Sequence, residues 1–420
     1  MTATDSTAAL EAVFRIEFAR LVGGLTRYVG DLGLAEELAQ EALVDALEQW
    51  PRDGMPRNPG AWLMTVGKRR AVDLFRRNRS LETKYAQIGR DLDTVALSDI
   101  DADVPDHIED DRLRLIFVAC HPTLSVPART ALTLRLLGGL TTVEIARAYL
   151  QSEATIAQRI VRAKKTIAEA RVPFEVPTGS DRAARLGSVL EVVYLIYNEG
   201  YSATAGDDWL RPELCAEALR LGRLLAALAP DEPEVHGLLG LMEIQSSRIG
   251  ARVGPSGEPI LLLDQDRRRW DRLLINRGLA ALQRAEDLGE QRGPYTLQAA
   301  IAACHARAFR PEETDWALLA DLYGVLAAAT PSPIIELNRA VALSMAAGPA
   351  VGLDLVDQIR ETGTLVRYHL LHSVRGDLLE RLGRTAEAAV EFELAARLAL
   401  NVAERDLMLD RARSAARASR

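Results

Sequence analysis

The stretch GGLTTVEIARAYLQSEATIAQRIVRAKKTI, from Gly138 to Ile167, decides the fold of the first half of the chain. Thr141 precedes Glu144 by three residues, which is the capping-box spacing that begins a helix. Ser152 can cap a second helix after a short turn. The stretch therefore predicts two short helices joined by a tight turn.

The second of these predicted helices has one apolar face and one polar face. Its apolar residues recur at i, i+4, i+7 and i+11 and form a single stripe: Ile156, Ile160, Ala163 and Ile167. The opposite face and its flank carry Thr155, Gln158, Arg159, Arg162 and Lys165. Two short helices with such an outer face are typical of a helix-turn-helix, although a plain helical hairpin in a bundle has the same pattern.

Charge is distributed in blocks along a chain of 420 residues with a formal net charge of −8. Residues 31–49 hold six acids and no Lys or Arg, and residues 50–90 hold ten bases against three acids. Residues 91–111 hold nine acids and no Lys or Arg, and residues 127–172 return to eight bases against three acids. Two basic islands in an acidic protein indicate local attraction to polyanions, although each island alone could be a solvated face.

The first basic island, NPGAWLMTVGKRRAVDLFRR over residues 58–77, predicts a helix capped by Asn58 with Pro59 at its first position. Its predicted inner face holds Trp62, Leu63, Val66, Val72 and Phe75. Its outer side carries Arg69, Arg70, Asp73, Arg76 and Arg77 at helical spacing. The preceding segment, GLAEELAQEALVDALEQW over 33–50, predicts an amphipathic helix with an acidic exterior and with Leu38, Ala42, Leu43, Ala46 and Leu47 inward.

Composition narrows the classes of protein and of site. Hydrophobic residues are 48% and charged residues 26%, as in a soluble globular protein, and no apolar run reaches the length of a membrane span. The start, MTATDSTAAL, has no signal-peptide pattern, and three widely spaced cysteines favour a reduced, cytoplasmic compartment. Cys120 stands beside His121 without a second pair at metal spacing, so we expect no metal and no cofactor. We expect no enzyme activity either, and interpret Glu199, Asp264 and Asp266 as a polar packing or partner surface.

The second half of the chain is predicted to be helical throughout. In SVRGDLLERLGRTAEAAVEFELAARLAL, residues 373–400, the tetratricopeptide (TPR) spacing of 0, 12, 16 and 19 falls on Gly376, Ala388, Phe392 and Ala395. The preceding segment repeats it more weakly at Ala340, Gly352, Val356 and Ile359. ARVGPSGEPILLL, residues 251–263, is the one candidate for a small β-hairpin.

The order of these blocks resembles an extracytoplasmic-function (ECF) sigma factor of bacterial RNA polymerase, over about residues 10–172. VVYLIYNEGYSAT (192–204) and DQDRRRWD (264–271) look like signatures of a subgroup with a C-terminal TPR-like extension. The resemblance implies an all-α chain, with the small hairpin as a possible exception. Its domains would be sigma region 2 (1–85), an acidic linker (86–112), the region 4 helix-turn-helix (113–172) and the TPR-like domain (180–420).

The resemblance also implies roles for residues of this sequence. Core RNA polymerase would be bound by Glu36, Glu37, Gln40, Glu41 and Asp45. The promoter −10 element would be held by Arg69, Arg70, Arg76 and Arg77, mostly through phosphates. The −35 element would be read by Thr155, Gln158, Arg159, Arg162 and Lys165. No residue needs to be catalytic, because the polymerase carries out the chemistry.

Three classes of function remain open on the sequence. The first is a sigma factor whose C-terminal domain modulates its activity through an intramolecular contact with region 4 or the linker. The second is a one-component helix-turn-helix regulator with a ligand- or peptide-binding TPR-like sensor domain. The third is a helical scaffold whose basic helices are incidental. The acidic helix followed by a basic island favours the first class, because a one-component regulator has no use for an acidic docking helix. No class requires a membrane.

Overall fold

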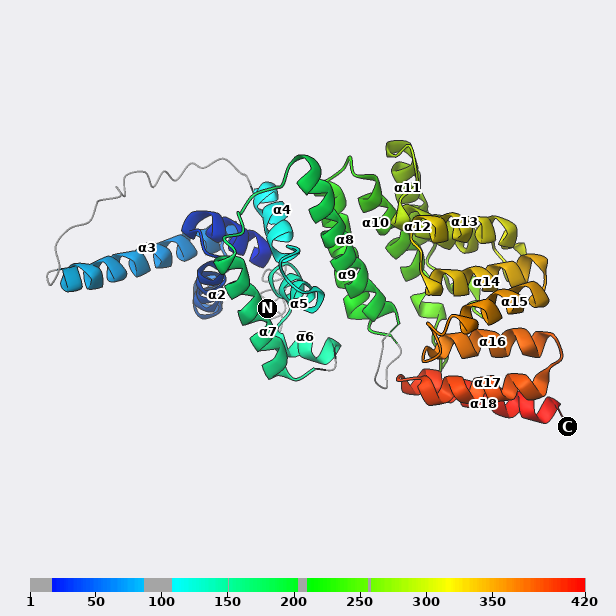
Figure 1. Cartoon of the computed structure of the whole chain (residues 1–420). Coiled ribbons are helices and arrows are strands. Elements are labelled where there is room, and N and C mark those ends of the chain that lie inside the picture. The colour runs from blue at the N-terminus through cyan, green and yellow to red at the C-terminus, as the bar shows by residue number, and fades with distance from the viewer. Residues whose placement is uncertain (1–16, 87–107, 150, 203–209, 256–257, 420) are drawn as a thin grey trace. The chain divides into compact units, whose positions relative to one another are not determined.

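The computed structural model describes residues 17–86, 108–149, 151–202, 210–255 and 258–419 (Figure 1). This described part is helical and contains no β-strand, so the all-α prediction is confirmed. The chain divides into two compact units, residues 1–192 (unit 1) and 193–420 (unit 2). The division falls inside one helix, α8 (Gly179–Tyr201). In the described part of the chain, no helix is long and apolar enough to cross a membrane.

Unit 1 holds the two predicted sigma regions. A helix over residues 17–29 is followed by α2 (Leu32–Asp53), α3 (Pro59–Ala86), α4 (Ile108–Ala119), α5 (Val126–Leu136), α6 (Thr142–Ala148) and α7 (Glu153–Glu169). The last residues of the predicted linker (86–112) are helical, because α4 begins at Ile108. The acidic residues at 87–107 lie outside the described residues.

The predicted helix starts are confirmed by their capping bonds. Asn58 accepts a hydrogen bond from the backbone N–H of Ala61 at 3.1 Å. Thr141 and Glu144 form the full capping box, and the Ser152 hydroxyl accepts from the N–H of Thr155 at 3.1 Å. Because each cap satisfies backbone groups that a helix end leaves open, these polar residues fix where α3, α6 and α7 begin.

Two predicted inward residues of unit 1 are exposed. Leu47 in α2 is 55% exposed and Phe75 in α3 is 39% exposed. Leu47 lies one position off the buried stripe that runs through Ala46 and Trp50. Phe75 follows Ala71, the last buried residue of α3 among the side chains described, so it lies beyond the packed part of that helix.

Unit 2 is a series of helices that pack in chain order. After α8 come α9 (Pro212–Leu228), α10 (Pro233–Ser246), α11 (Arg272–Leu288), α12 (Pro294–Arg307), α13 (Trp316–Ala329), α14 (Pro333–Ala347), α15 (Pro349–Glu361), α16 (His369–Arg381), α17 (Thr385–Leu398) and α18 (Val402–Ala418). From α12 to α18, each helix contacts the next one along the chain, and these helices form the yellow-to-red stack in Figure 1. Such nearest-neighbour packing is the architecture of a helical repeat domain.

The small residues of the predicted repeat lie where paired helices meet. A Cβ at Gly376 of α16 would be 2.7 Å from the ring of Phe392 in α17, which is fully buried. A Cβ at Gly352 of α15 would be 2.7 Å from the carbonyl oxygen of Ala340 in α14. Both glycines therefore permit a close approach that no larger residue allows.

The predicted hairpin at 251–263 is wrong. The segment forms one isolated bridge between Val253 and Pro259, with Ile260 N–H donating to the Arg252 carbonyl at 2.8 Å. Pro255 and Pro259 have no N–H to donate, so the ladder does not continue, and this part of the described chain is a loop.

Candidate nucleic-acid interface and docking surface

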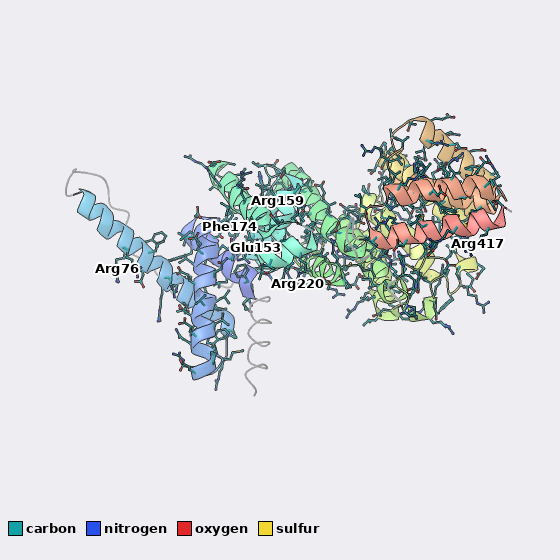
Figure 2. The ribbon with its side chains drawn as sticks, turned by 90° about the horizontal axis from the view of Figure 1, so that it is seen from below. Arg76, Glu153, Arg159, Phe174, Arg220 and Arg417 are labelled. Carbon is teal, nitrogen blue, oxygen red and sulfur yellow. The ribbon has the colours of Figure 1, made fainter. Side chains whose placement is uncertain are left out.

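The apolar stripe of α7 orients its polar face toward solvent. The stripe is buried throughout, with exposures of 5% or less at Ile156, Ile160, Ala163 and Ile167. It packs on α5 and α6, which completes the helix-turn-helix. On the opposite side, Thr155, Gln158, Arg162 and Lys165 are exposed and Arg159 is half-buried. Arg159 and Glu153 mark this helix in Figure 2.

The cations on the outer face of α7 are available to a ligand. Lys165 makes one ion pair at 3.6 Å with Glu169, and both side chains are largely exposed. Among the described residues, neither Arg159 nor Arg162 takes part in an ion pair. The structure thus places all five predicted reading residues on one side of one helix. Two guanidinium groups there are free to bind an anion or a base edge.

On α3, the predicted DNA-binding arginines divide into two kinds. Arg69, Arg76 and Arg77 are exposed, and Arg76 has a loose 3.4 Å pair with Asp73. Arg70 instead binds acids of α2, and these bonds fasten α3 to α2. Its distances are 2.6 and 2.9 Å to the two Asp45 carboxylate oxygens and 2.8 Å to a Glu41 oxygen.

The Asp45 hydrogen bond outweighs the effect of burial and raises the pKa of Arg70. Sequence reasoning had assigned Arg70 to DNA and Glu41 with Asp45 to the polymerase. In the structure, Arg70 binds both Glu41 and Asp45.

The outer face of α2 is acidic with an apolar centre. Glu37 and Glu41 are exposed, as predicted. Val44 and Leu47 beside them are 52% and 55% exposed. The prediction that Glu36 lies on this exterior is wrong, because Glu36 is only 3% exposed. Glu36 stands within the buried stripe of α2, three residues before Ala39 and seven before Leu43, and this spacing was the available signal.

Two cations from the predicted region 4 hold the buried Glu36. Arg135 of α5 donates to one carboxylate oxygen at 2.8 Å, and Lys164 of α7 donates to the other at 2.9 Å. Gln40, which is half-buried, donates to Glu36 at 2.8 Å from the same helix. We call Glu36, Arg135 and Lys164 the Glu36 clip. Its partners are 99 and 128 residues distant in sequence, so local patterns could not reveal it.

A second contact joins the same two regions. Arg27, on the helix over 17–29, donates to Asp111 of α4 at 3.0 Å, and the Asp111 side chain is 2% exposed. A Cβ placed on Gly23 would lie 3.0 Å from the Asp111 carbonyl oxygen. Region 2 therefore contacts region 4 both at α2 and at this earlier helix.

The first half of α8 belongs to unit 1 and packs on α4 and α5. The Ser188 hydroxyl donates to the Cys120 carbonyl at 2.6 Å and accepts from Arg129, which also pairs with Glu191 at 3.2 Å. Arg185 donates to the Phe117 carbonyl at 3.3 Å. The predicted C-terminal domain begins at residue 180, and the two compact units divide after residue 192.

The remaining sequence candidates have local structural partners. The Cys120 thiol is buried against the Thr133 hydroxyl, and burial raises its pKa to about 11. Glu199 bonds Arg211, and Asp266 accepts from Arg268 within an exposed turn. The part of the chain that the structure describes contains no cluster of three or more His, Cys, Asp or Glu able to hold a metal ion.

Comparison with known proteins agrees with this organisation. Residues 16–81 match the family model of sigma-70 region 2, residues 114–167 match sigma-70 region 4, and residues 185–286 match a family of unknown function, DUF6596. DUF6596 overlaps both motifs that were assigned to a C-terminally extended subgroup. No solved structure matches the chain.

Among curated proteins, an uncharacterized protein of Rhizobium meliloti, R00370, is 46% identical over 91% of this chain and 90% of its own length. The ECF RNA polymerase sigma factor SigK of Mycobacterium ulcerans is 32% identical over 34% of this chain and 74% of SigK. SigK of Mycobacterium tuberculosis is 30% identical over 35% of this chain and 78% of its own length.

The two sigma regions occur in the expected order along this chain. These matches support the sigma-factor part of the first class of function, over the one-component regulator and the scaffold. The chain belongs to the ECF sigma factors of RNA polymerase, which direct transcription initiation.

Proposed function

We propose that this sigma factor reads its promoter with α7 in the major groove of the −35 element and holds the −10 element with α3. The observation that carries this proposal is the exposed polar row of α7 opposite a fully buried apolar stripe. Arg can bond guanine through two donors, and Gln can bond adenine in the same way, so Arg162 and Gln158 supply base recognition. The exposed arginines of α3 supply phosphate contacts.

The outer face of α2 docks on the polymerase core. Its exposed acids, Glu37 and Glu41, border the exposed Val44 and Leu47. An apolar centre with a charged rim is the usual composition of a protein interface, and the sign of the rim calls for a basic partner surface. The chain itself carries out no chemistry in this scheme, because the polymerase synthesises the RNA.

Reconstituted transcription tests the promoter-reading role. Core polymerase, the full-length protein and a library of randomised promoters should yield transcripts from templates that share two sequence blocks. The Gln158→Ala variant should lose preference in the upstream block and keep it in the downstream block. Equal loss in both blocks, or no selection by the unaltered protein, would contradict the assignment of α7 to the −35 element.

We further propose that the C-terminal domain modulates activity through α8, which contributes residues to both compact units. The contacts of Arg185, Ser188 and Glu191 with α4 and α5 support this route. A chain that ends at Tyr201 keeps the whole of α8 and lacks the later helices of unit 2. We expect its transcription rate per bound core enzyme to differ from that of the full-length protein. Identical rates would leave unit 2 as an independent partner-binding domain.

A further inference from the structure

We propose that a cavity of unit 1 binds a nucleotide, with the phosphates on a cluster of cations and the base on Phe174. The cavity has a volume of about 600 Å³, which lies in the usual range for a small-molecule site. This binding site does not depend on the promoter-reading role proposed above, and it does not include the exposed acids of α2.

The cavity is lined by cations from three segments of unit 1. Arg27 comes from the helix over 17–29, Lys164 and Lys165 from the C-terminal end of α7, and Arg171 from the segment that follows α7. Among the described residues that line it, Asp31 is the one acid, and its carboxylate accepts the backbone N–H of Leu34 at 2.7 Å. The lining therefore has a clear excess of positive charge.

The acids that pair with two of these cations are shared with other cations. Asp111 accepts from Arg27 at 3.0 Å and from Arg114 at 2.7 Å. In the Glu36 clip, Lys164 likewise shares one carboxylate with a second cation. Each of these acids can neutralise only one of its two partners. A cleft lined by one sign of charge concentrates ligands of the opposite sign, so the cavity attracts anions.

The other two cations of the cavity are more available to a ligand. Lys165 pairs with Glu169 at 3.6 Å between side chains that are 72% and 66% exposed, and such a pair contributes little. Arg171 is exposed and makes no ion pair in the part of the chain that the structure describes. Arg binds phosphate through two donors and Lys binds it as a point charge, so the two together suit a phosphorylated ligand.

The backbone of Arg171 is an independent observation. Its φ is 48°, and among the described residues it is the one non-glycine residue with a positive φ. It follows the end of α7, where the Val172 N–H donates to the Ile167 carbonyl at 3.1 Å, as in a Schellman motif. Glycine is the usual residue at this position because a side chain is strained there. Strained residues gather at functional sites, and a ligand for the guanidinium accounts for an arginine here.

The apolar part of the lining favours a nucleotide over inorganic phosphate. Val118 and Ile167 are buried, whereas Phe174, which is labelled in Figure 2, is half-buried. Any base can stack on an aromatic ring, so an aromatic side chain beside cations can bind base and phosphate together. Lys165 also belongs to the row proposed to read the −35 element. A bound phosphate would lower the positive charge that α7 offers to DNA, and this consequence rests on the proposed function.

The test titrates the full-length protein with ATP, GTP and pyrophosphate by calorimetry, without DNA and without polymerase. Arg171→Gly removes a cation and relieves the strained backbone. Phe174→Ala removes the ring and keeps every cation. Arg162→Ala is the matched control, because Arg162 is an exposed cation of α7 that does not line the cavity.

We expect ATP or GTP to bind, and Arg171→Gly to weaken this binding on the order of tenfold, the usual effect of losing a charge-assisted hydrogen bond. The same variant should raise the thermal midpoint of the ligand-free protein, because glycine adopts this backbone conformation without strain. A purely structural role of the arginine side chain would lower that midpoint. Phe174→Ala should weaken nucleotide binding and leave pyrophosphate binding unchanged, and Arg162→Ala should change no affinity.

Failure of the unaltered protein to bind ATP or GTP overturns the proposal, as does unchanged nucleotide affinity in Arg171→Gly or Phe174→Ala. Equal losses in Arg171→Gly and Arg162→Ala would mean that the nucleotide only takes the place of DNA on the outer face of α7, and they overturn the proposal as well. None of these titrations contains DNA, so failure here is distinct from failure of the promoter-reading function.

Discussion

Two buried glutamates, one in each unit, have nearly the same surroundings and opposite consequences. Glu36 and Glu391 have side chains that are 4% and 5% exposed, and nitrogen donors bind both oxygens of each carboxylate. The partners of Glu391 are His372 and Arg375 in the adjacent helix α16, only 19 and 16 residues away. The partners of Glu36 lie in another sigma region. The same chemistry therefore joins neighbouring helices in unit 2, whereas in unit 1 it joins two sigma regions that are far apart in the sequence.

The largest effect should come from neutralising Glu391. Removing one partner of a buried ion pair costs about 3–5 kcal/mol because the other charges remain buried. We expect Glu391→Gln to lower the free energy of unfolding of unit 2 by about 3 kcal/mol or more. Glu36→Gln should release region 4 while the helices of both sigma regions stay folded. Denaturation monitored by hydrogen exchange distinguishes these two results. Loss of protection in the helices throughout unit 1 of the Glu36→Gln variant would contradict the comparison.

The exposed Arg162 on α7 tests whether this helix binds promoter DNA. Arg162→Ala should weaken binding to a cognate promoter by about 1–3 kcal/mol if its guanidinium bonds a base through two donors. If the guanidinium contacts phosphate alone, the loss of affinity should be similar on all DNA sequences. The slope of log affinity against log salt concentration should then become shallower by about one. Val161→Ala, at an exposed neighbour without a hydrogen-bonding group, is the control. Equal promoter binding by both variants would remove α7 from the interface.

A pair of glycines tests whether the stack of unit 2 depends on close packing. Gly376→Ala would bring a Cβ within 2.7 Å of buried Phe392, and overpacking of this kind costs about 1–3 kcal/mol. Gly324→Ala, in α13, meets nothing closer than 3.8 Å and should stabilise its helix by roughly 0.5–1 kcal/mol. Opposite shifts in thermal midpoint are expected. Shifts of the same sign would mean that the α16–α17 contact tolerates a side chain.

The smallest effect should be a pH dependence confined to unit 2. The hydrogen bond to Glu391 raises the pKa of His372 above its usual value near 6.5. A raised folded-state pKa gives stability that is complete below the unfolded pKa and is lost as the pH rises through the folded value. The α16–α17 pair should therefore weaken as the pH rises above about 6.5, by less than about 1.4 kcal/mol per pH unit. His372→Gln should flatten this profile in urea titrations, and an unchanged slope would refute the linkage.

The sequence was sufficient for features that depend on local spacing. The caps at Thr141 and Ser152 and the stripe from Ile156 to Ile167 are written within one or two turns of helix, so their periodicity predicted them. Contacts between distant segments were not predictable in this way. The pairing of Arg70 with Asp45 and of Glu36 with Lys164 depends on how helices pack, so no local spacing shows which of these charges meet.

The prediction of a hairpin at 251–263 was wrong because it considered only the turn residues. It did not consider that Pro255 and Pro259 lack the backbone N–H groups that a β-ladder needs. The predicted C-terminal domain rested on successive helical segments marked by Pro and Gly, and α8 begins at Gly179, one residue before its predicted start at residue 180. The roles of the individual polymerase- and DNA-binding residues stay predictions until the variants above are measured.

The burial of the Cys120 thiol against α5 has a consequence for chemical labelling. The thiol is 1% exposed, has a pKa of about 11, and belongs to the residue whose carbonyl accepts the Ser188 hydroxyl bond. A buried thiol with so little thiolate reacts slowly with alkylating reagents, and its rate rises when the covering structure lifts away. The native chain thus carries its own reporter. The alkylation rate of Cys120 records how often the packing around this thiol in unit 1 opens, without any added probe.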